Sequence, residues 1–446
     1  MQPGVLTCAV AGWVEPAASF AALYARSTAA FWLDSAGVGN SYMGAGVAHT
    51  AGGSAPGEGA ALLERVGADL AERRLENAPL PLGWVGWLGY ELRATTMGVD
   101  AQHRSRYPDA GFLAVDRGLA FDHAARTVTL VALGENWDGE LRDWRDRTLA
   151  ALAEVRVSAP AHPEPGRVPA ATAGWAYSDA EYLDMVRSCQ ESIRAGDAYQ
   201  LCLTTEASID VTPDPLATYL ALRTSSPSHH GAYLRVGEVA LLSATPEQFL
   251  TVSPSGTIES KPIKGTRPRG ATPARDDALR AELLASDKER AENLMIVDLM
   301  RNDIARVAEV GSVSVPSLLA VESYAHVHQL VSTVRGVLRS NLTGMDAVLA
   351  CFPAGSMTGA PKLSATLLLE ALEKRPRGIY SGAFGLFGLD GSIDLAMVIR
   401  SIILDPRGAT VGSGGGITAL SVPEEELAEV RLKAAALLRA LGVSQS

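Results

Sequence analysis

Apolar positions along the chain fall into short runs and into longer stretches with helical spacing. The runs Ala30 to Leu33, Gly83 to Tyr90, Ala198 to Glu206 and Val239 to Val252 are typical of strands. From Ser178 to Ala195 the apolar residues recur at helical spacing instead. The pattern therefore predicts both kinds of element in mixed order.

Two helices have additional signals. Ser178 is followed three residues later by Glu181, the spacing of a capping box at a helix N-terminus. The stretch from Asp276 to Val307 predicts one long helix. Because many of the predicted strands look antiparallel, the order of elements favours an α+β fold over a doubly wound parallel sheet.

One segment interrupts this organisation. Between Ser158 and Gly174, proline, alanine and glycine dominate and neither period persists. The interruption predicts a linker at 158–174 that separates an N-terminal region, 1–157, from a C-terminal region, 175–446.

Composition narrows the class of protein. The chain has 446 residues, 47% of them hydrophobic and 20% charged, which is typical of a globular protein. The net charge of -11 argues against binding to nucleic acid or to an anionic membrane. An anionic substrate would therefore need a metal ion or a few arginines to reverse the field locally.

The cysteines and the termini indicate a compartment. Cys8, Cys189, Cys202 and Cys351 lie far apart, without metal-ligand spacing, as expected in a reducing environment. No apolar run reaches membrane-spanning length, and the N-terminus lacks the pattern of a signal peptide. We expect a cytoplasmic protein.

Lys264 is the first candidate for chemistry. It follows the strand-like run Gly256 to Lys261 and precedes Gly265, so its amine can project into a pocket. A buried amine in its neutral form is a nucleophile. A single lysine, however, is more often a solvated surface charge.

Two pairs of acidic residues are candidates for a metal site. Glu289 and Glu292 lie three apart in a predicted helix, so both project from one face. Glu426 and Glu429 repeat that spacing, and Lys433 lies one turn further on. Two such pairs can hold Mg²⁺, which takes one or two direct carboxylates and keeps several waters. The alternative is that both are solvated helix faces.

Glycine-rich segments and one arginine are candidates for binding carboxylates. The segment 355–362 reads as a loop leading into a helix, and the glycines of 412–416 can expose consecutive backbone N–H groups to an anion. Neither segment has the spacing of a P-loop. Arg400 can bind a carboxylate with two parallel hydrogen bonds, although it can equally be a structural ion-pair partner.

Taken in order, these segments resemble the chorismate-utilising enzymes. The resemblance covers most of residues 178–435 and rests on the stretches 196–200, 245–249, 262–266, 289–303, 351–362, 378–382, 399–401 and 414–433. It implies a sandwich of two subdomains with largely antiparallel sheets flanked by helices, and a catalytic C-terminal region.

Within this family, Lys264 distinguishes the branches. Anthranilate synthase large subunits usually carry alanine at the matching position, whereas component I of the aminodeoxychorismate synthases carries lysine. The resemblance therefore implies that chorismate and ammonia are converted to 4-amino-4-deoxychorismate, on the way to p-aminobenzoate and folate. Lys264 would add to C2 of chorismate as the hydroxyl leaves C4, and ammonia would then add at C4 and expel the lysine.

The resemblance also implies roles for the other residues. Mg²⁺ would be held by Glu292 and Glu429 directly, and by Glu289 and Glu426 mostly through water. Glu247 is a candidate general acid or water-positioning group, or is structural. Binding of the substrate is implied for a further set of residues: Gly265, Thr266, Thr358, Tyr380, Arg400, Gly414, Gly415, Gly416 and Lys433.

Two places depart from the family or match it less strongly. Within 326–332 the residue before the leucine is often histidine in the family, but here it is Gln329, which cannot titrate. The glutamine therefore argues against a lyase activity, unless His328 supplies the titratable group instead. Near the N-terminus, the segment from Trp32 resembles a region where an aromatic amino acid binds, so Asp34 and Ser35 are predicted to line a tryptophan-sized pocket; the alternative is a plain core strand.

A partner is also implied. No cysteine lies in the turn of a glutaminase nucleophile, so ammonia must come from solution or from a separate glutamine amidotransferase subunit. Three functions stay open at this point: amination of chorismate at C4, a related reaction (anthranilate, aminodeoxyisochorismate or isochorismate synthesis), and a non-catalytic subunit of a synthase complex.

Overall fold

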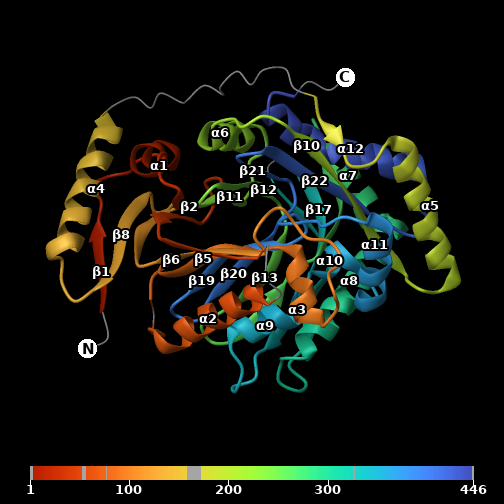
Figure 1. The fold of residues 1–446 in the computed structure, drawn as a ribbon, viewed down its shortest axis with the longest axis horizontal. Helices are drawn as coiled ribbons and strands as arrows, with labels where there is room; N and C mark the ends of the chain where they lie inside the picture. Colours follow the sequence, from red (N-terminus) through yellow and green to blue (C-terminus); the bar gives the residue numbers. More distant parts are fainter. Residues whose placement is uncertain (1–3, 53–56, 77, 158–171, 325–326, 444–446) are drawn as a thin grey trace.

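Two antiparallel sheets form the centre of the protein (Figure 1). The computed structural model describes residues 4–52, 57–76, 78–157, 172–324 and 327–443. Residues 158–171 of the predicted linker lie outside these ranges.

The first sheet has 12 strands and the second has 10. In spatial order, the first contains β1 (Gly4–Ala9), β8 (Thr127–Gly134), β7 (Arg117–Asp122), β3 (Asn40–Ala45), β2 (Ala29–Asp34), β11 (His230–Val236), β12 (Val239–Thr245), β21 (Ser401–Asp405), β22 (Gly408–Ile417), β10 (Gln200–Ile209) and β18 (Gly359–Ala360), with β9 (Gly174–Trp175) paired to β10. The second contains β15 (Ile263–Pro268), β17 (Val327–Val337), β14 (Thr257–Ser260), β13 (Gln248–Val252), β20 (Ile393–Met397), β19 (Ala383–Gly388), β5 (Gly83–Leu88), β6 (Ala110–Val115) and β4 (Val47–Ala51), with β16 (Ser314–Ser323) paired to β17.

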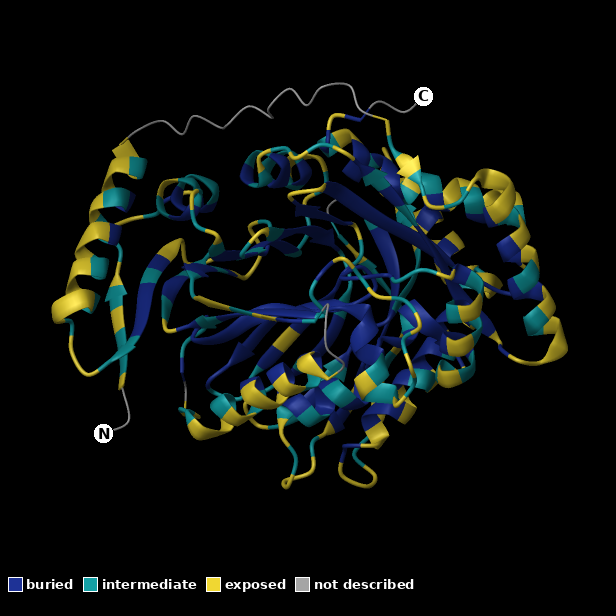
Figure 2. Ribbon diagram, in the orientation of Figure 1, coloured by how far each residue is buried: buried dark blue, intermediate teal, exposed yellow. Residues whose placement is uncertain are grey.

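Helices cover the outer faces of the two sheets, and many of the exposed positions lie on them and on the loops (Figure 2). The helices are α1 (Pro16–Tyr24), α2 (Glu58–Glu72), α3 (Arg93–Met97), α4 (Gly139–Val157), α5 (Asp179–Ala195), α6 (Pro215–Ser225), α7 (Pro273–Ala285), α8 (Asp287–Ala305), α9 (Gly344–Cys351), α10 (Gly355–Thr358), α11 (Lys362–Glu373) and α12 (Pro423–Ala440), together with the 3₁₀ turn Tyr90–Leu92.

Alternation along the strands explains the layers. On β2, Phe31 belongs to the core between the two sheets, whereas its neighbour Trp32 points to the opposite face and packs on Phe20 of α1. The same cluster of buried residues continues through Trp87 of β5 to Ile296 of α8. The predicted α+β class and the sandwich of antiparallel sheets flanked by helices are therefore confirmed.

The strands on either side of the predicted linker share both sheets. In the first sheet β2 pairs with β11, and in the second β5 pairs with β19. Segments from 1–157 and 175–446 are thus hydrogen-bonded to each other in each layer.

Two predicted elements are interrupted in the structure. The single helix expected over Asp276 to Val307 is two helices, α7 and α8, because Ser286 leaves the helical conformation and its side chain accepts the Glu289 N–H as an N-cap. The single strand expected over Val239 to Val252 is β12 and β13, which belong to different sheets. The capping box of Ser178 and Glu181 is confirmed.

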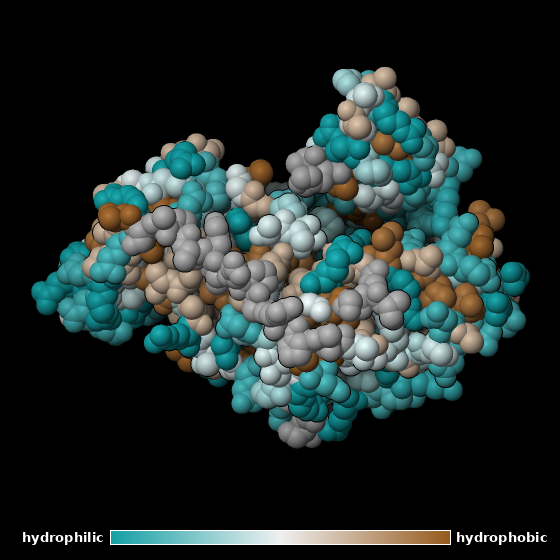
Figure 3. All heavy atoms as spheres, turned by 90° about the horizontal axis from the view of Figure 1, so that it is seen from above, coloured by the Kyte–Doolittle hydropathy of each residue, from teal (hydrophilic) through white to brown (hydrophobic). Residues whose placement is uncertain are grey.

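The outer surface agrees with the composition. Seen from above, hydrophilic residues cover much of the molecule and hydrophobic ones are scattered among them (Figure 3). Within the residues that the structure describes, no helix combines the length and the apolar character needed to cross a bilayer.

Candidate active site

A pocket of about 500 Å³ collects most of the residues singled out in the sequence. Its walls come from β15, α8, β22 and α12, together with Glu247, Tyr380 and Arg400. The predicted residues in its lining are Glu247, Lys264, Gly265, Thr266, Glu289, Glu292, Tyr380, Arg400, Gly414, Gly415, Gly416, Glu426, Glu429 and Lys433.

Lys264 projects into this pocket from β15. Its side chain is 14% exposed, and its Nζ lies 3.9 Å from a carboxylate oxygen of Glu292 on α8. On the opposite wall a methyl group added to Gly416 would lie 3.2 Å from the same Nζ. The amine therefore lies between the carboxylate of Glu292 and the backbone at Gly416, where no side chain blocks the approach of a ligand.

Glu247 lies where the chain crosses from one sheet to the other. It follows the end of β12 in the first sheet and precedes β13 in the second, so its carboxyl group reaches the pocket between the layers. Burial raises the pKa of Glu247, and this effect outweighs the Ser356 hydrogen bond and the charges of Lys264 and Lys433, which lower it. Glu247 thus keeps its proton to a higher pH than an ordinary glutamate.

The four glutamates of the two predicted pairs all reach the pocket. Glu289 and Glu292 come from α8, and Glu426 and Glu429 from α12. Two glycines make room for them, because a methyl group on Gly265 would lie 2.6 Å from a carboxylate oxygen of Glu289, and one on Gly415 would lie 3.0 Å from a carboxylate oxygen of Glu426.

Each of these glutamates has a cationic neighbour. Besides the Lys264 contact to Glu292, the pairs are Arg267 with Glu289 at 3.2 Å, Lys288 with Glu426 at 3.5 Å and Lys433 with Glu429 at 2.6 Å.

The two pairs differ in electrostatics. Burial raises the pKa of Glu292 in spite of Lys264. At Glu429 burial is again the largest single effect, but the charge and hydrogen bond of Lys433, together with the charges of Lys288 and Lys264, outweigh it and lower the pKa.

The donor set suits a hard divalent cation, since carboxylate oxygens are the ligands that Mg²⁺ prefers. Among the described residues, no three acidic, histidine or cysteine side chains stand close enough to hold a metal ion as they are placed. The carboxylates therefore fit such an ion by chemistry and location, but they would have to turn from their lysine and arginine partners to bind it directly.

The remaining polar groups form a second wall. Lys433 Nζ donates to the carbonyl oxygen of Gly414 at 2.8 Å, and Arg400 donates to the carbonyl oxygen of Lys433 at 3.4 Å. Arg400 has a φ of 51°, a left-handed conformation that is uncommon for a residue with a side chain and occurs often at binding sites. The ring of Tyr380 packs on Gly412, where a methyl group would lie 2.1 Å from it.

Three predicted residues lie elsewhere. Thr358 is fully buried, does not line the pocket and donates to the carbonyl oxygen of Ala354 at 3.2 Å. Asp34 pairs with Arg223 at 2.5 Å and lines a separate cavity of about 130 Å³. Ser35 does not line that cavity, and its hydroxyl lies 3.1 Å from that of Ser41.

His328 cannot replace the titratable group that Gln329 lacks. Consecutive residues of a strand face opposite sides of the sheet. Gln329 lines the pocket, whereas His328 lies 2.8 Å from the Ser323 hydroxyl and 2.9 Å from Asp276. His326, at the start of that segment, lies outside the described residues.

Sequence reasoning did not single out Lys288, Arg267 or Ser356, all of which line the pocket. Lys288 lies four residues before Glu292, a spacing that places the two on one helix face. That signal was available, whereas the approach of Arg267 to Glu289 depends on how β15 packs on α8.

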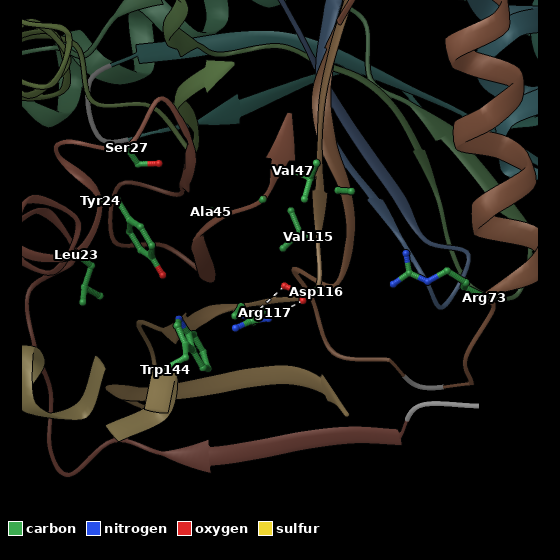
Figure 4. A pocket seen from close by; sticks show the side chains of 12 residues that line it. Leu23, Tyr24, Ser27, Ala45, Val47, Arg73, Val115, Asp116, Arg117 and Trp144 are labelled. Carbon is green, nitrogen blue, oxygen red and sulfur yellow. Dashed lines mark hydrogen bonds and ion pairs between the residues drawn. The ribbon is translucent and has the colours of Figure 1, made fainter. Parts of the chain in front are cut away.

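A second cavity, of about 510 Å³, lies between α1, α4 and the strands around Val47 and Val115 (Figure 4). Tyr24 and Trp144 project into it, but its charged groups are already in ion pairs, Arg117 with Asp116 at 2.9 Å and Arg73 with Asp69 at 3.1 Å. It lacks the lysine and carboxyl groups that the first pocket brings together.

Comparison with known proteins agrees with this geometry. The model of the chorismate binding enzyme family matches residues 28–439. Aminodeoxychorismate synthase of Streptomyces pristinaespiralis is 43% identical over 95% of this chain and 63% of its own length. The protein of the same name from Streptomyces griseus is 48% identical over 84% of this chain and 52% of its own length. The chain thus spans between about half and two-thirds of these relatives.

A solved structure shows the same fold. Anthranilate synthase component I from Streptococcus pneumoniae superposes with a TM-score of 0.72 and 27% identity, over 98% of this chain and 92% of that one. The protein therefore belongs to the chorismate binding enzyme family, and the resemblance inferred from its sequence is confirmed.

Proposed function

We propose that the protein is an aminodeoxychorismate synthase, which converts chorismate and ammonia to 4-amino-4-deoxychorismate and water. The observation that carries the proposal is the amine of Lys264, placed in one pocket with the carboxyl group of Glu247. The names of the two Streptomyces relatives support it.

The proposed reaction is a double displacement. The amine of Lys264 attacks C2, the ring double bonds shift toward C4, and the C4–O bond breaks with a proton from Glu247, so the hydroxyl leaves as water. Ammonia then attacks C4, the double bonds shift back, the C2–N bond to Lys264 breaks, and one proton of the former ammonia returns to Glu247. The lysine is regenerated, and the net change replaces the C4 hydroxyl with an amino group. The raised pKa of Glu247 favours the proton donor that the first step needs.

The second wall of the pocket would hold the two carboxylates of chorismate. Arg400 and Lys433 supply the charges, Tyr380 supplies a hydroxyl, and the amides of 414–416 supply neutral donors. Gly265 and Thr266 would form the wall beside the ring.

Mg²⁺ is the cofactor that the glutamates favour. We infer that Glu292 and Glu429 bind it directly and that Glu289 and Glu426 act mostly through water. When bound, the ion would neutralise the ring carboxylate and draw electron density from the ring. Lys288 and Lys433 lie beside these glutamates and would hold the site together without the ion.

A separate glutamine amidotransferase is the proposed source of ammonia. The four cysteines lie within β1, α5, β10 and α9, not in the sharp turn that presents a glutaminase nucleophile. The amino product would lead to p-aminobenzoate and folate, or to a related aromatic metabolite.

Anthranilate synthesis is the second candidate, favoured by the likeness to anthranilate synthase component I. Release of pyruvate requires an acid or base near the ring, and Gln329 cannot titrate, which counts against this candidate.

The test of the proposed function is to incubate the protein with chorismate, Mg²⁺ and an ammonium salt and to identify the product by chromatography and mass. Aminodeoxychorismate is expected, whereas anthranilate and pyruvate, or no product, would contradict the proposal.

A further inference from the structure

Gln329 is an unexplained polar group in the pocket wall. The residue is 4% exposed, and its Oε1 has no hydrogen-bond partner. Among the described residues that line the pocket, no other has a buried side-chain nitrogen or oxygen without a partner. A buried acceptor left unpaired is costly and calls for an explanation, such as a ligand that completes it.

The location of Gln329 ties it to the reacting groups. On β17 it lies directly opposite Thr266 of β15, so the two side chains are on the same face of the sheet, and both line the pocket. Lys264 is two residues from Thr266 on the same strand. The carboxamide is therefore part of the wall from which the amine projects.

Its chemistry differs from that of the carboxyl groups around it. Attack by ammonia requires a free lone pair, so the acceptor that holds ammonia must take an N–H without supplying a proton. The glutamates paired with cations would favour charged ammonium, which is not a nucleophile, and Glu247 would do the same, because it is ionised once it has protonated the leaving hydroxyl. A carboxamide is neutral and does not titrate.

We propose that Gln329 forms the ammonia subsite, in which its Oε1 accepts an N–H from the incoming ammonia. This inference rests on the proposed function and adds a positioning residue to it. Gln329 would orient ammonia without taking part in bond making, and Lys264 and Glu247 would carry the chemistry.

The test uses Gln329→Met, which keeps the length of the side chain and removes the hydrogen bond. With ammonium salt as the nitrogen source, we expect the KM for ammonia to rise between about threefold and about tenfold, the effect of one neutral hydrogen bond. Binding of chorismate, measured by calorimetry, should not change. If Gln329 only shaped the pocket wall, its replacement would change the KM for ammonia and the affinity for chorismate together, or would change neither. Either outcome would overturn the proposal.

Gln329→Glu gives a second reading if Gln329→Met does not fold. Its carboxylate should favour ammonium, so kcat should fall while the KM for total ammonium does not rise; an unchanged kcat would contradict the proposal.

The matched control is Glu322→Gln on β16. Glu322 lies opposite Gln329 in the sheet but outside the pocket, and its carboxylate accepts a hydrogen bond from Tyr324 at 2.5 Å. This control should have the KM of the wild type. If wild-type protein forms no amino product, the proposed function fails; if it does and Gln329→Met keeps its KM, only this inference fails.

Discussion

Replacing Lys264 with arginine separates the two roles that the pocket allows for this residue. Lysine can act as a nucleophile or only as a positive charge beside Glu292, 3.9 Å away. Arginine keeps the charge, but its guanidinium is not deprotonated in proteins and so cannot add to C2. Lys264→Ala removes both roles and serves as the comparison.

The electrostatic part can be bounded from the distance. Two unit charges about 4 Å apart attract by about 4 kcal/mol at an effective dielectric constant of ~20, an upper limit before the cost of desolvation is subtracted. Both side chains are largely buried, with 14% and 10% exposed, so screening by solvent is modest. Loss of a covalent catalyst adds a separate cost, and a thousandfold loss of rate corresponds to about 4 kcal/mol of barrier.

We therefore expect Lys264→Arg to lose amination by about a thousandfold or more, nearly as much as Lys264→Ala, while both still bind chorismate through Arg400 and Lys433. Slow attack of water or ammonia at C2 would give other products, separable by chromatography. With wild-type protein and no ammonia, intact mass should show an adduct of chorismate less one water. If Lys264→Arg makes aminodeoxychorismate near the wild-type rate, the covalent mechanism is wrong.

Three further outcomes are expected. Glu292→Gln and Glu429→Gln should each raise the Mg²⁺ concentration needed for half-maximal activity by about tenfold or more, since each removes a charge that would offset the ion; full activity of both at low Mg²⁺ would contradict the metal site. Because burial raises the pKa of Glu247, its acid form should persist above the ordinary range, and kcat should fall only as pH rises through that raised pKa. Glu247→Gln should lower kcat by about a hundredfold or more and remove this alkaline limb, and a wild-type profile in that variant would exclude Glu247 as the acid. Calorimetry with tryptophan should detect no binding, because the cavity beside Asp34, about 130 Å³, is close in volume to one of ~150 Å³ that binds benzene or xenon, both of which are smaller than tryptophan; a measurable heat would show that the cavity opens.

Much of the fold followed from periodicity and local signals. The capping box at Ser178 appears as expected because its hydrogen bonds lie within four residues. The break of the long helix at Ser286 was missed, since apolar spacing continues on both sides of it. The crossing between sheets at Glu247 was also missed, because alternation within a strand does not reveal which sheet it joins.

For the candidate site, too, some features were predicted from the sequence and others were not. Residue types and spacing on single helices predicted the acid pairs, and the order of motifs predicted that Lys264 would meet them. The orphaned oxygen of Gln329 and the approach of Arg267 to Glu289 depend on packing between strands and helices far apart in sequence, so no local pattern contains them. The ion pair of Asp34 with Arg223 likewise joins β2 to α6, which lie far apart in sequence.

Charge balance in the pocket supports the proposed metal ion. Its described lining carries five cationic side chains and five carboxyl groups, so with all of them ionised it is formally neutral in a chain of net charge -11. A proton on Glu247 adds one positive charge, which is too little to balance a substrate with two carboxylates. A divalent cation among the glutamates would make the electrostatic potential of the pocket clearly positive, and it would also free Lys433 from its ion pair with Glu429 to meet a substrate carboxylate. On this proposal the lysines beside the glutamates would have two roles, since they would stabilise the site without the ion and would become available to the substrate when the ion replaces them.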